Sequence, residues 1–172
     1  LGAKEDYYNQ ILGRAIYDVY GTKIPPDATF TLRISDGVIK SYNYNGTMAP
    51  PNTTFYGMLD RYYSFDKKYP WEIHSRWLNP PADFDFGTPF NFISTNDIIG
   101  GNSGSPMINK NAEVVGLIFD GNIESMSGEF IYSSEVPTTV SVDSRGLLEA
   151  INDMYNLKRI GSELVNGKII NN

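Results

Sequence analysis

A glycine-rich segment of seven residues, Gly100–Pro106, separates two apolar regions and constrains the fold more than any other part of the chain. The apolar run before it spans residues 90–93, and the runs after it span residues 107–108 and 114–119. Because glycine adopts backbone conformations that other residues avoid, three glycines within seven residues predict a tight bend. Apolar runs on both sides predict that this bend connects strands of a β-sheet.

Strand-like patterns continue on both sides of the bend. Apolar and polar residues alternate from Ala28 to Ile34, and a second run from Val38 to Tyr44 follows the turn residues 35–37, so this region predicts a hairpin. Strands are expected at residues 28–34, 38–44, 90–93, 107–108, 114–119, 130–132 and 138–142, and residues 53–59 are a further candidate strand. About six or seven short strands with turns between them predict a mainly β fold, an antiparallel Greek-key β-barrel.

Helical periodicity marks the two ends of the chain. Apolar residues recur every three or four positions over residues 5–20, and Gly21 is expected to end that N-terminal helix. A short helix is expected within residues 71–78. Asp143 is expected to cap a C-terminal helix. The apolar stripe of that helix comprises Leu147, Leu148, Ile151, Met154 and Tyr155.

Composition excludes several classes of function. The formal net charge of −6 disfavours nonspecific binding to nucleic acid, because phosphates repel an acidic surface. The chain has no cysteine and one histidine, which leaves no disulfide, no thiolate metal site and no support for a metal or another cofactor. No apolar run approaches the roughly 20 residues that span a membrane.

Ser103, at the centre of the bend, is the first candidate for chemistry. The neighbouring glycines leave room for a substrate carbonyl, and the N–H groups of Gly101 and Ser103 can converge on a developing oxyanion. This arrangement is typical of the nucleophile of chymotrypsin-like serine proteases, and the alternative is a surface turn. The single histidine, His74, lies in an aromatic-rich segment, which favours a structural role over that of the base.

Two aspartates near the bend have competing interpretations. Asp120 ends the strand after the bend, but Asp-Gly is a strong turn pair, so residues 120–121 alone favour a hairpin turn. Asp97 lies six residues before Ser103, a spacing that places a pocket carboxylate in trypsin-like enzymes. An Asx turn or a cap at the start of the loop is the favoured interpretation of Asp97.

Two motifs together resemble the bacterial dipeptidyl-peptidase 7 and 11 family: residues 92–106 resemble its serine-bearing loop and residues 116–122 its next strand. The resemblance covers most of residues 15–165. Members of this family release dipeptides from free N-termini and have a chymotrypsin-like double barrel with an inserted helical domain. The resemblance therefore implies that residues 25–172 are the C-terminal barrel with its closing helix. Residues 1–24 would be the helical connection from the inserted domain.

The resemblance also implies roles for individual residues. Ser103 matches the nucleophile, and the N–H groups of Gly101 and Ser103 match the oxyanion donors. Asp120 matches a carboxylate that binds the substrate's terminal amine. Gly121 matches a pocket residue that is arginine in members preferring acidic side chains, so glycine implies an apolar or broad preference at the penultimate residue. Asn102 stands where trypsin-like zymogens carry an aspartate that pairs with a new N-terminus, so no such activation is implied.

The catalytic histidine and aspartate of that family belong to its N-terminal barrel, which this chain lacks. Since the chain begins at Leu1, we expect it to be a fragment that is nearly inactive alone. Its expected partners are peptides with a free N-terminus and the missing barrel and helical domain, with a homodimer possible for the intact enzyme. The family implies a bacterial periplasmic, secreted or cell-surface location. A glutamyl-type endopeptidase and a noncatalytic binding module remain open alternatives.

Overall fold

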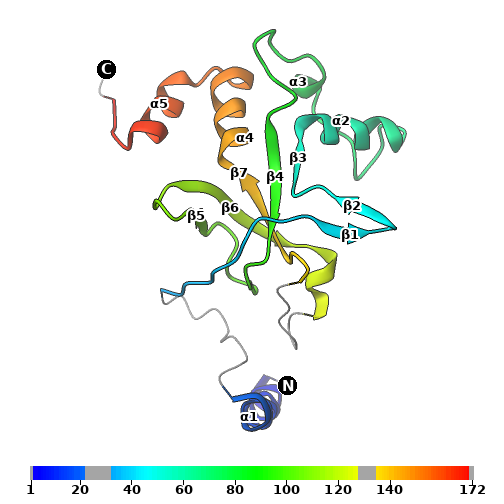
Figure 1. Cartoon of the computed structure of the whole chain (residues 1–172), viewed down its shortest axis with the longest axis vertical. Coiled ribbons are helices and arrows are strands. Elements are labelled where there is room, and N and C mark those ends of the chain that lie inside the picture. Colours follow the sequence, from blue (N-terminus) through cyan, green and yellow to red (C-terminus); the bar gives the residue numbers. More distant parts are fainter. Residues whose placement is uncertain (1, 22–31, 128–134, 171–172) are drawn as a thin grey trace.

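A computed structural model describes residues 2–21, 32–127 and 135–170 of the chain (Figure 1). The elements in chain order are α1 (Gly2–Tyr20), β1 (Tyr42–Tyr44), β2 (Thr47–Ala49), β3 (Asn52–Thr54), α2 (Phe55–Ser64), α3 (Ser75–Leu78), β4 (Pro89–Ser94), β5 (Pro106–Ile108), β6 (Val114–Gly121), the 3-10 helix η2 (Ile123–Ser127), β7 (Thr139–Asp143), α4 (Ser144–Glu149), the π-helix η3 (Ala150–Met154) and α5 (Lys158–Asn166).

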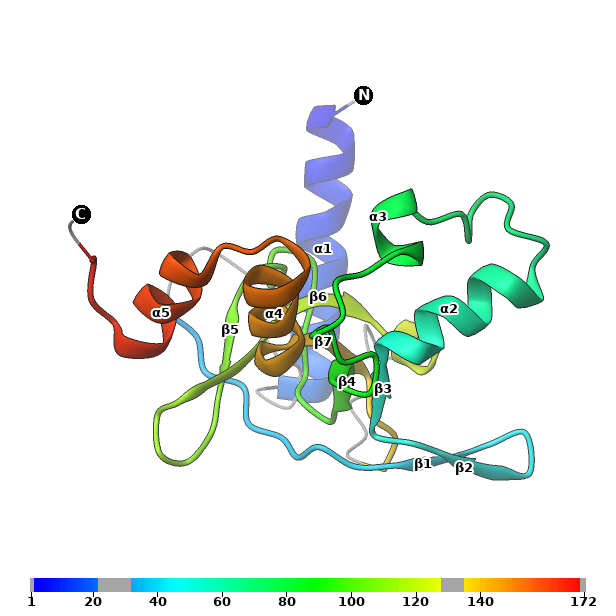
Figure 2. The ribbon, with the colours of Figure 1, turned by 90° about the horizontal axis from the view of Figure 1, so that it is seen from above.

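An antiparallel sheet of five strands forms the centre of the molecule, in the order β3-β4-β7-β6-β5. The last strand in the sequence, β7, lies between β4 and β6, so it joins the strands before and after the glycine-rich bend. β1 and β2 form a separate hairpin. Helices flank the sheet, with α2 and α3 on one side and α4 and α5 on the other (Figure 2). The expected antiparallel β fold with N-terminal and C-terminal helices is confirmed.

One face of the sheet is buried with the period of two that strands require. In β7 the alternate residues Thr139, Ser141 and Asp143 are buried, and Phe92 pairs with Ser141 from β4. Across the sheet, a Cβ on Gly116 would lie 2.6 Å from the Phe92 ring. Glycine at this position therefore lets β6 pack directly on that ring.

A second apolar cluster lies where the chain approaches β4. Its buried members are Phe55, Phe84 and Met154. The Phe55 ring stacks on Phe90 at the start of β4, with 4.6 Å between ring centroids. The carboxylate of Glu149 accepts a hydrogen bond of 2.7 Å from the Asp85 N–H, which ties α4 to the segment before β4. This cluster fixes α2, α3 and η3 at the N-terminal end of β4.

The expected hairpin around residues 35–37 is wrong. Within the described residues, 32–38 form no strand, and only Ile39 makes an isolated antiparallel bridge, to Ser94. The hairpin is β1–β2, which turns at Asn45 and Gly46, whose φ angles are 48° and 73°. Asn-Gly accepts two positive φ angles and so forms the turn that a two-residue hairpin prefers. The expected strand residues 28–31 and 130–132 lie outside the described residues.

The expected strand at 53–59 is largely replaced by a helix. β3 ends at Thr54, and α2 begins at Phe55. The buried and half-buried residues Phe55, Met58, Leu59 and Tyr62 recur at helical spacing, and Phe55 and Met58 belong to the second apolar cluster. The expected helix within 71–78 is shorter, starting at Ser75.

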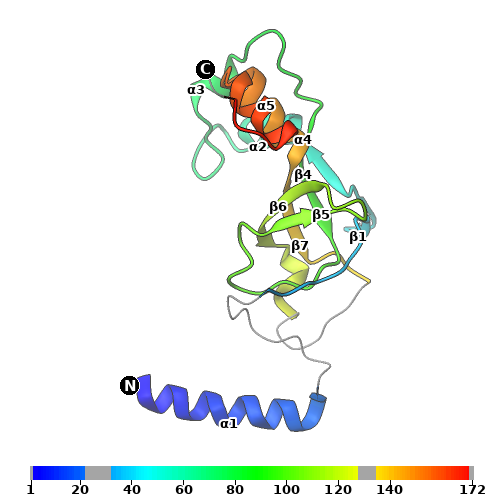
Figure 3. The ribbon, with the colours of Figure 1, turned by 90° about the vertical axis from the view of Figure 1, so that its left-hand side faces the viewer.

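The expected terminal helices are present. α1 ends before Gly21, whose φ is 59°, and none of its residues is buried; it lies apart from the sheet (Figure 3). Asp143 caps α4 by accepting a hydrogen bond from the Arg145 N–H. The C-terminal helix is not continuous, because the π-helix η3 follows α4 and a separate helix, α5, comes after it.

Candidate active site

The segment between β4 and β5, residues 95–105 and here called the serine loop, forms the expected bend. The Asn102 N–H donates to the Ile99 carbonyl at 3.1 Å, and the Ser105 N–H donates to the Asn102 carbonyl at 2.9 Å. Gly101 and Gly104 have φ angles of 101° and 87°, a region that disfavours side chains. The glycines on either side of Ser103 are therefore required by the bend itself.

The serine loop is fastened to β6 beside the end of that strand. The Gly104 N–H donates to the Ile118 carbonyl at 2.7 Å, and the Ile118 N–H donates to the Ser105 carbonyl at 2.9 Å. The exposed Ser103 hydroxyl is 3.4 Å from the Phe119 carbonyl, to which it donates. Ser103 is thus held next to the residue that precedes Asp120.

The N–H groups of Gly101 and Ser103 are both available to a bound group. Within residues 2–21, 32–127 and 135–170, neither N–H donates a hydrogen bond. Both residues are exposed, and Asn102 lies between them. Two N–H groups without a hydrogen-bond partner in the described residues, and one exposed hydroxyl, therefore lie within three consecutive residues of the bend.

Asp120 and Gly121 lie in β6, so the hairpin-turn interpretation of this pair is wrong. They pair with Val140 and Thr139 of β7, and a bulge at Phe119 precedes them. The Asp120 carboxylate is exposed and accepts a hydrogen bond of 2.8 Å from the Gly121 N–H. The end of β6 is therefore a rigid, paired position that presents a carboxylate near Ser103.

The space beside Gly121 faces the 3-10 helix η2. A Cβ at Gly121 would lie 2.5 Å from the Ser125 hydroxyl oxygen, so a larger residue would require that side chain to move. The sequence analysis did not identify Ser125, because nothing in the sequence around it marks a turn back toward β6. Neither Gly121 nor Ser125 carries a charge, while the Asp120 carboxylate accepts the hydrogen bond of the Gly121 N–H.

Asp97 does not form the expected Asx turn. The Ile99 N–H that such a turn would use donates instead to the Asn102 side-chain oxygen, at 3.0 Å. Partial burial raises the pKa of the Asp97 carboxyl, and the nearby Arg33 charge partly offsets this rise. Arg33 also donates to the Asn102 side-chain oxygen, at 2.9 Å.

His74 is the N-cap of α3, where its Nδ1 accepts a hydrogen bond of 3.1 Å from the Arg76 N–H. α3 precedes β4 and the serine loop follows it, so His74 and Ser103 are associated with opposite ends of that strand (Figure 1). A strand of six residues spans about 17 Å. The structure does not bring His74 to Ser103, in agreement with the structural role expected for this histidine.

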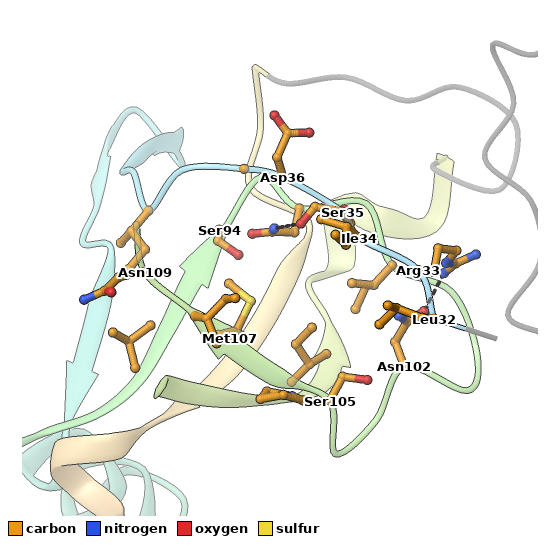
Figure 4. A pocket seen from close by; sticks show the side chains of 18 of the residues that line it. Leu32, Arg33, Ile34, Ser35, Asp36, Ser94, Asn102, Ser105, Met107 and Asn109 are labelled. Carbon is orange, nitrogen blue, oxygen red and sulfur yellow. Dashed lines mark hydrogen bonds between the residues drawn. The ribbon is translucent and has the colours of Figure 1, made fainter. Parts of the chain in front are cut away.

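A cavity of about 1010 Å³ lies between the segment 32–39, the serine loop and β5. Figure 4 shows Arg33 and Asn102 linked at its border, with Met107 on the side of β5. In the described part of the chain, no cluster of three or more His, Cys, Asp or Glu side chains could hold a metal ion. No described helix has both the length and the apolar character needed to cross a membrane.

Comparison with known proteins gives a consistent result. The sequence model of the family described as peptidase S46 matches residues 2–166. Dipeptidyl-peptidase 7 of Phocaeicola vulgatus is 35% identical over 146 residues, covering 81% of this chain and 20% of the relative. The Asp/Glu-specific dipeptidyl-peptidase of Porphyromonas endodontalis is 30% identical over 158 residues, covering 87% of this chain and 22% of the relative.

Solved structures show the same likeness. DPP11 of Porphyromonas endodontalis in complex with the dipeptide Arg-Glu superimposes with a TM-score of 0.71 at 26% identity, covering 91% of this chain and 23% of that one. The expected fold class, one antiparallel barrel of the chymotrypsin type, is thereby confirmed. The chain spans about a fifth of the length of the curated relatives it matches.

Proposed function

The chain belongs to the peptidase S46 family, and from this we propose that it carries the nucleophile of a serine-type dipeptidyl-peptidase. The observation that carries the proposal is the exposed Ser103 hydroxyl on a glycine bend, flanked by two unbonded N–H groups. Residues 25–172 are then the nucleophile-bearing barrel with its closing helix, and residues 1–24 connect it to a helical domain of the same polypeptide.

In the proposed reaction, the Ser103 oxygen attacks the carbonyl of the second peptide bond of the substrate. A histidine from another part of the full-length polypeptide accepts the hydroxyl proton and then donates it to the leaving amine. The N–H groups of Gly101 and Ser103 stabilise the oxyanion, and water then hydrolyses the acyl-enzyme.

Asp120 supplies the anchor that makes the enzyme an exopeptidase. Its exposed carboxylate follows Phe119, whose carbonyl contacts the Ser103 hydroxyl. A substrate ammonium ion that loses water in a closed cleft needs a compensating charge, which this carboxylate provides. Binding the terminal amine at a fixed place beside the nucleophile would determine which peptide bond is cleaved.

The proposed side-chain preference is apolar or broad. Gly121 and Ser125 place no charge at the position where a basic residue would attract an acidic side chain. The family likeness supports action in a bacterial periplasm, at the cell surface or outside the cell. A homodimer of the intact enzyme belongs to the same proposal.

The test uses the full-length polypeptide with chromogenic dipeptidyl substrates that have a free or an acylated amine. We expect hydrolysis of the free-amine substrates alone. Ser103→Ala should lower kcat by about 10⁶-fold, as loss of the nucleophile does in other serine proteases. The matched control Ser105→Ala, in the same loop, should lower kcat far less.

Two results would contradict the proposal. Equal cleavage of the acylated and free-amine substrates would identify an endopeptidase, whose base would have to reach Ser103. Absence of any hydrolysis, together with retained peptide binding, would identify a noncatalytic binding module.

A further inference from the structure

We propose that Arg33 is a positioning residue that holds the serine loop in its reactive conformation through Asn102. The inference rests on the proposed function of Ser103. It assigns to a side chain of the chain itself the support that a newly cut N-terminus provides in trypsin-like enzymes after zymogen activation.

Asn102 organises the bend that contains the two oxyanion donors. Its side-chain oxygen accepts hydrogen bonds from the Ile99 N–H at 3.0 Å and from Arg33 Nη2 at 2.9 Å. Its backbone bonds to Ile99 and Ser105 close the bend on either side. Among these four bonds only the one from Arg33 comes from outside the loop, and it joins residues 69 positions apart.

The segment that carries Arg33 is itself fixed against the start of the loop. The Asp97 N–H donates to the Ser35 hydroxyl at 3.0 Å, and the Asn96 side chain donates to the Ser35 carbonyl at 2.8 Å. Farther along, the Thr95 N–H donates to the Val38 carbonyl at 3.0 Å, and the Val38 N–H donates to the Thr95 hydroxyl at 3.0 Å.

Close packing reinforces these bonds. A Cβ on Gly37 would lie 2.5 Å from the Asn96 nitrogen, so the two segments are in direct contact. The guanidinium group of Arg33 therefore reaches Asn102 from a fixed position.

The geometry connects Arg33 to the reacting atoms through one residue. The Ser103 N–H belongs to the peptide bond that follows Asn102, and the Gly101 N–H belongs to the residue that precedes Asn102. A charge-assisted hydrogen bond to the Asn102 side chain is stronger than a neutral one and restricts rotation of that side chain. When the Asn102 side chain is held in place, the N–H groups of Gly101 and Ser103 point in defined directions.

The experiment measures kcat and KM in the full-length enzyme for Arg33→Ala, Arg33→Lys and the exposed control Arg14→Ala. Since removal of a single oxyanion donor costs about 10²–10³ in kcat, misdirecting the donors with Arg33→Ala should lower kcat about tenfold or more. KM should change much less, and Arg33→Lys should recover part of the loss. Asn102→Ala combined with Arg33→Ala should be no worse than Asn102→Ala alone, because the loss of the Asn102 side-chain oxygen already removes the bond from Arg33.

Hydrogen–deuterium exchange over residues 98–105 supplies a readout that does not need activity. Arg33→Ala should speed exchange in this segment, whereas Arg14→Ala should not. An active enzyme whose kcat is unchanged by Arg33→Ala would overturn the inference. If the unsubstituted full-length protein hydrolyses no substrate, the proposed function is refuted. In that case, faster exchange in Arg33→Ala would still support the role of Arg33 in holding the serine loop. Unchanged exchange in Arg33→Ala would overturn the inference as well.

Discussion

The bulged residue Phe119 decides where the carboxylate of Asp120 lies. Ile118 pairs with Ser141 on the buried face, and after the bulge Asp120 pairs with Val140. In a regular ladder Asp120 would pair with Thr139, which is fully buried. One extra residue therefore moves the carboxylate from the buried face to the exposed face, since a shift of one position exchanges the two faces.

Asp120→Asn in the full-length enzyme tests the amine anchor. Losing the charge while keeping the shape should raise KM for free-amine dipeptidyl substrates by about 10- to 100-fold, the range expected for a hydrogen bond between charged groups. Steady-state kinetics measure the effect, and Asp83→Asn, a substitution at an exposed aspartate, is the control. An unchanged KM would remove Asp120 from the site.

At the residue scale, sequence reasoning succeeded where the determinant was local. The glycines around Ser103 predict the bend because both φ angles there are positive. Arg33 and Ser125 were not identified, because their partners are separated from them by 69 and four residues and no local pattern marks either contact. The Arg33 hydrogen bond depends on the fold as a whole, and the approach of Ser125 to Gly121 depends on the 3-10 helix that follows β6.

Among the elements, a segment too short to show its period was assigned wrongly. Residues 53–59 contain too few alternations to distinguish a strand from a helix. The spacing of Phe55, Met58 and Tyr62 is helical, and burial of Phe55 among aromatic rings stabilises the helix. The long strands β4, β6 and β7 were predicted at residues 90–93, 114–119 and 138–142, and their buried residues alternate over five positions in β7 and over three in β4 and β6.

Asp143 connects two elements, since it ends β7 and caps α4. Its carboxylate is buried and accepts hydrogen bonds from the Arg145 N–H and guanidinium, at 2.7 to 2.9 Å. Asp143→Ala should destabilise the protein by about 1–2 kcal/mol through loss of the cap. Asp143→Asn keeps an acceptor for the N–H and should destabilise it less.

Urea denaturation monitored by circular dichroism measures these differences. Arg145→Ala tests the ion pair separately, since it removes the guanidinium and leaves the Asp143 side chain, which is 4% exposed, with the backbone N–H donor. Equal destabilisation by the Ala and Asn variants of Asp143 would show that the cap is not the source of the effect.

In the whole molecule, β4 separates two regions with different tasks. Its N-terminal end carries the aromatic cluster with α2, α3 and His74, and its C-terminal end leads into the serine loop. The one histidine of the chain is thus held in the structural region. Ser103, the proposed nucleophile, and the proposed oxyanion donors occupy the other region, and the histidine does not.

This separation predicts that the 172-residue chain alone is unreactive. A fluorophosphonate probe requires an activated serine, so the isolated chain should show no labelling, whereas the full-length polypeptide should be labelled at Ser103. Mass spectrometry of the labelled peptide identifies the site, and full-length Ser103→Ala is the control. Stoichiometric labelling of Ser103 in the isolated chain would mean that a base lies within it.

The central place of β7 has a consequence for synthesis on the ribosome. β4 and β6 are translated before β7, but neither pairs with the other, and both pair with residues 139–143. A nascent polypeptide that stops short of Thr139 contains Ser103, Asp120 and every loop residue between them. It still lacks the strand that sets β4 beside β6, so the five-stranded sheet is assembled only after residues 139–143 have emerged.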